Sequence, residues 1–192
     1  MTEREKYAPG PAAGASVDKA VHEDGEKWAL VVVRELRHPP EMVWQALTDP
    51  AQLSEWAPFD ADRNLATVGP VKLSTVGTPT PQISASTVKR AEAPRLLEYG
   101  WGGNDMRWEL EPLGSGTRLT LWHNIDRHYI SWGAAGWHIC FDVLDRFLAG
   151  EPIGRIVAGD AMKFPGWQRL TAEYARQFGV ASPGSTPNPA QR

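Results

Sequence analysis

Two histidines and one aspartate are the side chains of this sequence best suited to acid–base or ligand chemistry. His138 and Asp142 stand four residues apart, the spacing at which side chains meet on a helix, so the carboxylate can accept a proton from the imidazole and fix its tautomer. His123 follows Leu119 and Leu121 in an alternating stretch, which places it on the apolar face of a strand. If that helix and strand pack together, both imidazoles enter one pocket. A histidine held by a carboxylate can act there as a general base.

Three roles stay open for these histidines: structural, ligand-anchoring and catalytic. The structural role is the simplest, with one imidazole bonded to a backbone carbonyl and the other to Asp142. A metal site formed by His123, His138 and Asp142 would have suitable ligand types but no diagnostic spacing, so we predict no metal and no other cofactor. Cys140, the single cysteine, falls on a different helical face from His138 and is expected to be a buried, inert thiol.

Tryptophan is in excess, with 9 copies against 4 tyrosines and 5 phenylalanines. Trp44 and Trp137 fall on helical stripes and are expected in the core. Trp56 ends a short helix, and Trp101 and Trp108 lie on strands, where a large ring with one N–H donor can line a cavity. For each ring taken alone, packing is the simpler interpretation. As a group, the rings favour a cavity lined by aromatic side chains.

The residues that we predict to bind a ligand combine these rings with the ionisable groups. Tyr99 joins them because it alternates onto the strand face of Trp101 and can supply a hydroxyl. The predicted set is Trp56, Tyr99, Trp101, Trp108, His123, His138 and Asp142.

The elements that must position these residues follow from the hydrophobic pattern. Residues 106–123 form two alternating runs joined by Gly114-Ser115-Gly116, which is typical of a β-hairpin. Residues 132–149 have helical spacing of apolar residues, and Gly150 ends the helix. The predicted order is a strand at 28–36, a helix starting at Pro39-Pro40, a short helix at 51–56, strands between 64 and 124, the helix at 132–149 and a last helix from about 167. This order predicts an α+β domain with helices on one face of an antiparallel sheet and a cavity beneath the long helix.

Length and composition set the outer limits. The chain has 192 residues, of which 42% are hydrophobic and 22% charged, as expected for one folded domain. Its net charge of −3 provides no positive field to attract nucleic acid, so we expect no nucleic-acid partner. No apolar run is long enough to span a bilayer, so we expect no membrane partner and a cytoplasmic location. Residues 1–26 lack an apolar period and are predicted to be a flexible leader. The folded domain is predicted at 27–180, and residues 181–192 are predicted to be a flexible tail.

Three segments of the chain resemble a known superfamily. They are HPPEMVWQALTDPAQLSEWAPF (38–59), GTRLTLWH (116–123) and AAGWHICFDVLDRFLAGEPIG (134–154). Together they resemble the START-like, or SRPBCC, superfamily, and within it the branch named after the activator of Hsp90 ATPase homologue 1, over about residues 28–178. The resemblance implies the helix-grip fold of START-like and Bet v 1-like proteins, a curved antiparallel sheet around a long C-terminal helix with an internal ligand cavity.

The function that the resemblance implies is less specific, because relatives include lipid carriers, polyketide cyclases and hormone receptors. The leading hypothesis is a protein that binds a hydrophobic or aromatic small molecule and is not an enzyme. The alternatives are a cyclase or hydrolase using His138 and Asp142 on a substrate held by Trp56 and Trp101, and a chaperone- or stress-related interaction module. Stimulation of Hsp90 is not expected, because in the family it belongs to larger proteins with a further N-terminal domain. A homodimer stays open.

Overall fold

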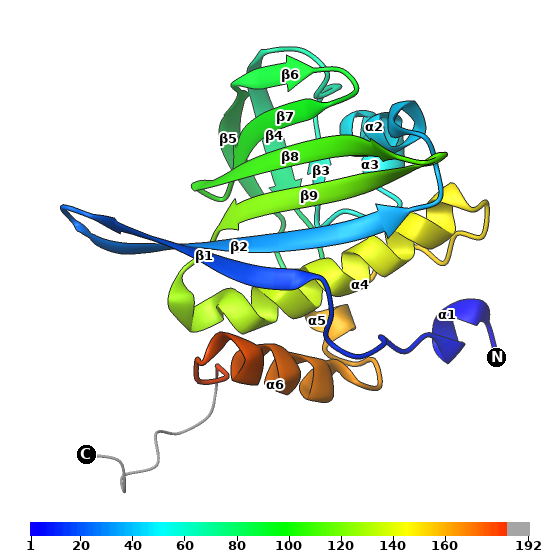
Figure 1. Cartoon of the computed structure of the whole chain (residues 1–192). Coiled ribbons are helices and arrows are strands. Elements are labelled where there is room, and N and C mark those ends of the chain that lie inside the picture. Colours follow the sequence, from blue (N-terminus) through cyan, green and yellow to red (C-terminus); the bar gives the residue numbers. More distant parts are fainter. Residues whose placement is uncertain (184–192) are drawn as a thin grey trace, which may run out of the picture.

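Six antiparallel strands form the main sheet of the computed structural model, which describes residues 1–183 (Figure 1). Their order across the sheet is β1-β2-β9-β8-β7-β6, so β1 and β6 are the two edges. These strands are β1 (Ala15–His22), β2 (Gly25–Leu36), β6 (Arg90–Glu92), β7 (Leu96–Trp101), β8 (Asn104–Leu113) and β9 (Gly116–Asn124). A second sheet, in the order β3-β4-β5, consists of β3 (Phe59–Ala61), β4 (Gly69–Thr75) and β5 (Gln82–Val88).

A long helix, α4 (Ile130–Leu148), packs across one face of the main sheet, and α6 (Trp167–Phe178) packs on α4 from the other side (Figure 1). The remaining helices are α1 (Glu3–Lys6), α2 (Pro40–Thr48), α3 (Pro50–Leu53), the 3₁₀ helix η1 (Arg127–Tyr129) and α5 (Ala158–Ala161). The curved antiparallel sheet, the long C-terminal helix and the two short helices after β2 confirm the predicted α+β helix-grip architecture.

Strand alternation determines which side chains face α4. In the centre of the sheet His123 of β9 pairs with Leu30 of β2 on one side and with Met106 of β8 on the other, and all three side chains are buried. The β8–β9 hairpin lies where its Gly-Ser-Gly turn predicts. Gly116 at the start of β9 is required for a close approach, because a Cβ there would lie 2.3 Å from the carbonyl oxygen of Leu36. The apolar face of β9, with its single histidine, is therefore turned inward as predicted.

The N-terminal segment differs from the flexible leader predicted for residues 1–26. Residues 15–22 form edge strand β1, paired with β2 along its length, and Tyr7 is buried. Hydrogen bonds to α6 order the stretch between them: Arg169 donates to the carbonyl oxygen of Pro9, and Glu173 accepts from the amide of Ala12. The segment has no apolar period of its own, so its order comes from docking onto elements far away in the sequence.

At the other end of the chain, the predicted tail at 181–192 falls largely outside the described residues, which end at position 183. Within the described part, no helix combines the length and apolarity needed to cross a bilayer.

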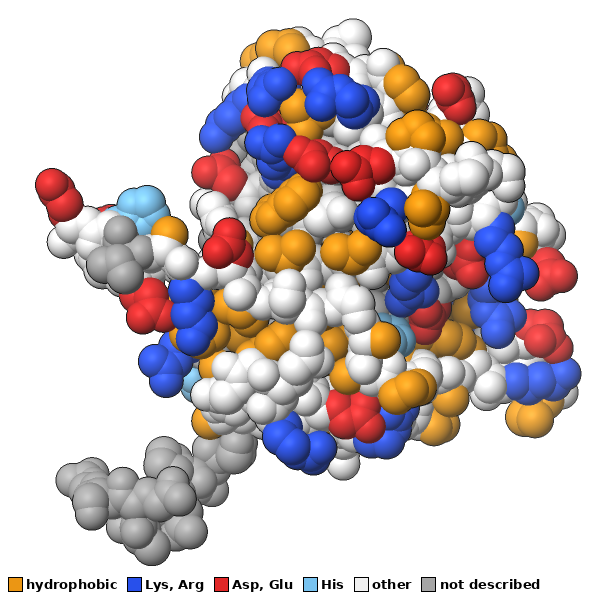
Figure 2. All heavy atoms as spheres, in the orientation of Figure 1, with side chains coloured by type: hydrophobic (Ala, Val, Ile, Leu, Met, Phe, Trp, Pro, Cys, Tyr) orange, Lys and Arg blue, Asp and Glu red, His pale blue; other side chains and the backbone are white. Residues whose placement is uncertain are grey.

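The outer face of the sheet carries charged side chains of both signs, visible over β6 to β8 in Figure 2. Arg107 of β8 pairs across strands with Glu98 of β7 at 3.3 Å, and Lys89 pairs with Asp105 at 2.9 Å. Exposed pairs of this kind contribute little to stability. They mark this face as solvated, so the candidate site must be sought on the opposite face.

Candidate functional site

A cavity of about 560 Å³ lies between the N-terminal half of α4, the ends of β7 and β9, and the segment 156–162. Its volume lies within the range of ligand pockets for small molecules, roughly 300–1,000 Å³. Its rim is exposed, because Tyr129 and Met162 leave about half of their surface to solvent. The aromatic residues of its wall are Trp101, Tyr129, Trp132, Trp137 and Trp167.

One stripe of α4 forms the floor of this cavity. Gly133, Gly136, Trp137 and Cys140 all line it, at the spacing that places residues on a single helical face. At Gly136 a Cβ atom would meet nothing within 4 Å, so the missing side chain leaves real space. A glycine inside a helix costs about 1 kcal/mol relative to alanine. The helix is therefore less stable by this amount at the position that borders the empty space of the cavity.

His123 is the buried imidazole of the cavity wall. Its Nδ1 accepts a hydrogen bond from the indole nitrogen of Trp137 at 3.0 Å. The ring of Trp101 stacks on it with centroids 5.8 Å apart and an interplanar angle of 28°. Burial lowers the pKa of His123 to about 4, so the imidazole is neutral at neutral pH. Its Nε2 has no hydrogen-bond partner among residues 1–183.

Other groups of the wall are already engaged. Trp101 donates from its indole nitrogen to the hydroxyl of Thr75 at 2.8 Å, which fixes the ring against the end of β4. Asp126 accepts from the backbone amide of His128 and so caps η1. Burial raises the pKa of Cys140 to about 12, so the thiol is neutral and suits the inert role predicted for it.

The segment that covers the cavity is held by the N-terminus. Arg4 donates from Nη1 to three successive carbonyl oxygens, those of Ile153, Gly154 and Arg155, at 2.8–3.1 Å. Arg155 in turn bonds the carbonyl oxygen of Ser54 and the carboxylate of Asp60. Ile156, Val157 and Ala158, which follow directly, line the cavity. The predicted leader is therefore part of the structure that closes the site.

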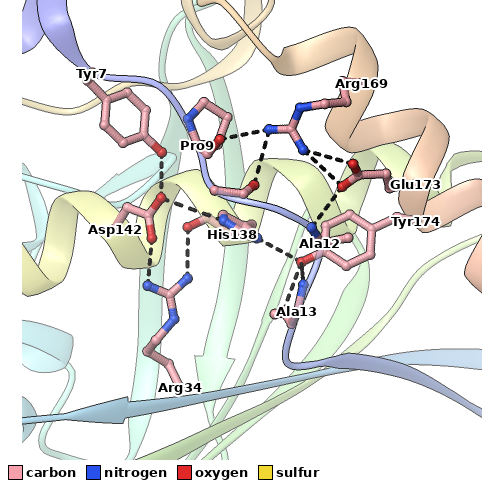
Figure 3. A network of polar contacts seen from close by, with 11 residues as sticks. Tyr7, Pro9, Ala12, Ala13, Arg34, His138, Asp142, Arg169, Glu173 and Tyr174 are labelled. Atoms are coloured by element: carbon pink, nitrogen blue, oxygen red, sulfur yellow. Dashed lines mark hydrogen bonds and ion pairs between the residues drawn. The ribbon is translucent and has the colours of Figure 1, made fainter.

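His138 and Asp142 lie on the opposite side of α4 from the cavity, facing the N-terminal segment and α6 (Figure 3). His138 Nδ1 lies 2.8 Å from the hydroxyl of Tyr174. Asp142 accepts from the hydroxyl of Tyr7 and from Arg34, both at 2.6 Å, whereas its nearest approach to His138 Nε2 is 3.6 Å. That distance is too long for a hydrogen bond, so Asp142 does not fix the imidazole as the sequence predicted. Burial lowers the pKa of His138.

The structure thus separates the two imidazoles expected in one pocket. It also places Trp56, Tyr99 and Trp108 behind the cavity wall rather than in it, since none of the three lines the cavity and each is at most 1% exposed. Trp56 donates to the carbonyl oxygen of Ala46, as a core tryptophan does. Of the predicted ligand-binding residues, Trp101 and His123 line the cavity.

The sequence prediction missed four aromatic residues of the cavity wall, which are Tyr129, Trp132, Trp137 and Trp167. Trp137 is the most informative of them. It was expected in the core, and it is 3% exposed, but it also lines the cavity and bonds His123. The available signal was the set of small residues on this part of the helix, Gly133, Gly136 and Cys140, which leave space beside a large ring.

No group of three or more His, Cys, Asp or Glu side chains within the described part of the chain is placed to hold a metal ion. The cavity wall offers aromatic surface, a neutral imidazole and a neutral thiol. Such a wall can bind an uncharged molecule by burial of apolar area and orient it by a hydrogen bond.

Comparison with known structures gives the fold independently. The crystal structure of CalU16 from Micromonospora echinospora is similar over 86% of this chain and 94% of its own, with 20% identity and a TM-score of 0.62. The conserved protein EF2215 from Enterococcus faecalis, of unknown function, is similar over 84% of this chain and 90% of its own, with 13% identity and a TM-score of 0.62. A protein from Arthrobacter aurescens covers 74% of this chain and 95% of its own, with 23% identity and a TM-score of 0.56. At these identities the likeness concerns the fold alone.

Sequence comparison identifies the family. The chain matches no curated protein. The family model described as activator of Hsp90 ATPase homolog 1-like protein matches residues 37–149, which include α2, α3, β9 and α4. This match covers more than half of the chain, and the chain therefore belongs to the family of activator of Hsp90 ATPase homologue 1-like proteins.

Proposed function

We propose that this protein binds an uncharged, mostly apolar small molecule in the cavity between α4 and the sheet. The observation that supports this most strongly is the cavity of about 560 Å³ with tryptophan walls, which α4 leaves open at Gly136. A bound apolar molecule would cover the aromatic wall that the open side of this cavity leaves accessible to water.

Binding is favoured over catalysis by the placement of the ionisable groups. His138 and Asp142, the predicted acid–base pair, are engaged with Tyr7, Arg34 and Tyr174 away from the cavity. His123 lines the cavity, but a general base works best with a pKa near the working pH, and burial lowers that of His123 to about 4.

Binding in the cavity is also favoured over a protein-interaction surface. Of the large exposed hydrophobic side chains, those away from the cavity include Met42, Val68, Ile83 and Leu113, which lie on or beside separate elements. Tyr129 and Met162 are also exposed, and both belong to the rim of the cavity. Single exposed residues of this kind are normal on a soluble surface.

Titration with fluorene, a rigid tricyclic hydrocarbon, tests the proposal. Trp101 and Trp137 line the cavity, so we expect saturable quenching of tryptophan fluorescence with a dissociation constant on the order of 10 μM. Fluorene carboxylate is the matched control. It should bind at least about tenfold more weakly, because the lining includes no lysine or arginine to pair with it. Absence of saturable quenching by fluorene, or equal affinity for its carboxylate, would contradict the proposal.

A further inference from the structure

The imidazole of His123 is held in one tautomer by its neighbour. The indole nitrogen of Trp137 is a donor only, so the Nδ1 atom that it contacts at 3.0 Å must be the acceptor. In a neutral imidazole the proton then sits on Nε2. The protein therefore fixes an N–H donor on the ring that lines the cavity.

This donor has no acceptor among the described residues, although less than 1 Å² of its nitrogen is exposed. Buried donors in native proteins are nearly always paired, and one left unpaired is destabilising. The hydrogen bond from Trp137 and the stacked ring of Trp101 hold the imidazole in this orientation. Because so little of Nε2 is exposed, a ligand oxygen reaches it only when the side chains that cover it shift on binding, and the unpaired donor then gains its acceptor.

We infer that the ligand of this cavity carries an uncharged oxygen acceptor, a carbonyl or hydroxyl oxygen, that accepts a hydrogen bond from Nε2 of His123. This inference rests on the proposed function and adds the ligand class to it. A carboxylate or phosphate ligand is disfavoured, because the lining includes the acidic Asp126 and no basic side chain other than the neutral His123. The aromatic wall then selects a mostly apolar ring system around that single polar atom.

A pair of probes that differ by one carbonyl group tests this inference. Fluorene and fluorenone share the same rigid tricyclic frame, and only fluorenone offers an oxygen acceptor. We expect the ratio of fluorenone to fluorene affinity to be about fivefold to tenfold higher in the wild-type protein than in His123→Phe, which is the effect of one net hydrogen bond. Comparing ratios cancels the difference in hydrophobicity between the probes. His138→Gln, which changes the imidazole outside the cavity, should keep the wild-type ratio.

NMR of the wild-type protein gives a second readout that does not depend on how well the variant folds. The imidazole proton of His123 should reside on Nε2 in the free protein, and its resonance should lie further downfield with fluorenone bound than with fluorene bound, because only the carbonyl oxygen accepts a hydrogen bond from it. Equal ratios in the wild type and His123→Phe, or a proton on Nδ1, would overturn the inference while leaving fluorene binding intact. Failure of both probes to bind would instead contradict the proposed function, and the inference with it.

Discussion

Replacing Gly136 with phenylalanine is expected to abolish fluorene binding and leave the fold intact. Gly136 is inside α4, lines the cavity, and would present a Cβ with nothing within 4 Å. A benzyl group attached there occupies the space that the ligand needs, so affinity should fall at least about 100-fold. Stability should stay the same or rise by about 0.5–1 kcal/mol, because the helix loses an interior glycine and fills empty volume.

Fluorescence titration and urea denaturation of the same samples measure both effects. Asp145→Phe is the matched control, since it places the same ring on the exposed side of α4 and should leave fluorene affinity unchanged. Undiminished fluorene affinity in a folded Gly136→Phe protein would show that the probe binds elsewhere.

The stability of the protein should fall by about 3 kcal/mol between about pH 7 and pH 4 because of His123 alone. Burial lowers the pKa of this imidazole to about 4 in the folded state, whereas its ordinary value in the unfolded chain is 6.5. Between these values the unfolded chain binds a proton that the folded protein does not, so acid favours unfolding. Above about pH 6.5 both states are neutral, and below about pH 4 both are protonated, so the loss is confined to this window.

The contribution of His123 is isolated by comparison with His123→Phe. The free energy of unfolding from urea denaturation should fall less steeply with acid in the variant, by about 3 kcal/mol over the window. The pKa of His138 is also lowered by burial, but that imidazole is present in both proteins and its contribution cancels in the difference. Parallel pH profiles of the two proteins would mean that His123 is not held in its neutral form.

The architecture could be predicted because its signals are local. The Gly-Ser-Gly turn and the alternation on either side of it define β8 and β9, and the apolar stripe at 132–149 lies within one or two residues of α4. Alternation also placed His123 on the inner face of the sheet, since a strand has only two faces. These features need no information about other elements.

The spacing of apolar residues in the sequence does not determine how α4 is rotated about its own axis in the folded protein. Adjacent helical residues point about 100° apart. Trp137 is turned toward the sheet and bonds His123, and His138 is therefore carried round toward α6. Which of the two neighbours faces the cavity depends on how the whole helix packs. For this reason, periodicity could not decide whether His123 and His138 lie in the same pocket.

The role of the N-terminal segment was out of reach for a different reason. Arg4 bonds carbonyl oxygens about 150 residues away, and Tyr7 bonds Asp142 across 135 residues. Neither contact leaves a local pattern, because each residue is a single side chain in a polar stretch. The composition of this segment predicts that it cannot form a hydrophobic core by itself. Composition cannot show that the segment docks onto the core formed by the other residues.

The central claim is that the cavity between α4 and the sheet is the binding site. Locating bound fluorene tests this claim most directly. Isotope-filtered NMR detects contacts between the protons of the probe and those of the protein. We expect contacts from fluorene to the α protons of Gly136 and to the indole rings of Trp101 and Trp137, all of which line the cavity. Contacts confined to the outer face of the sheet, such as the half-buried ring of Trp122, would contradict binding in this cavity.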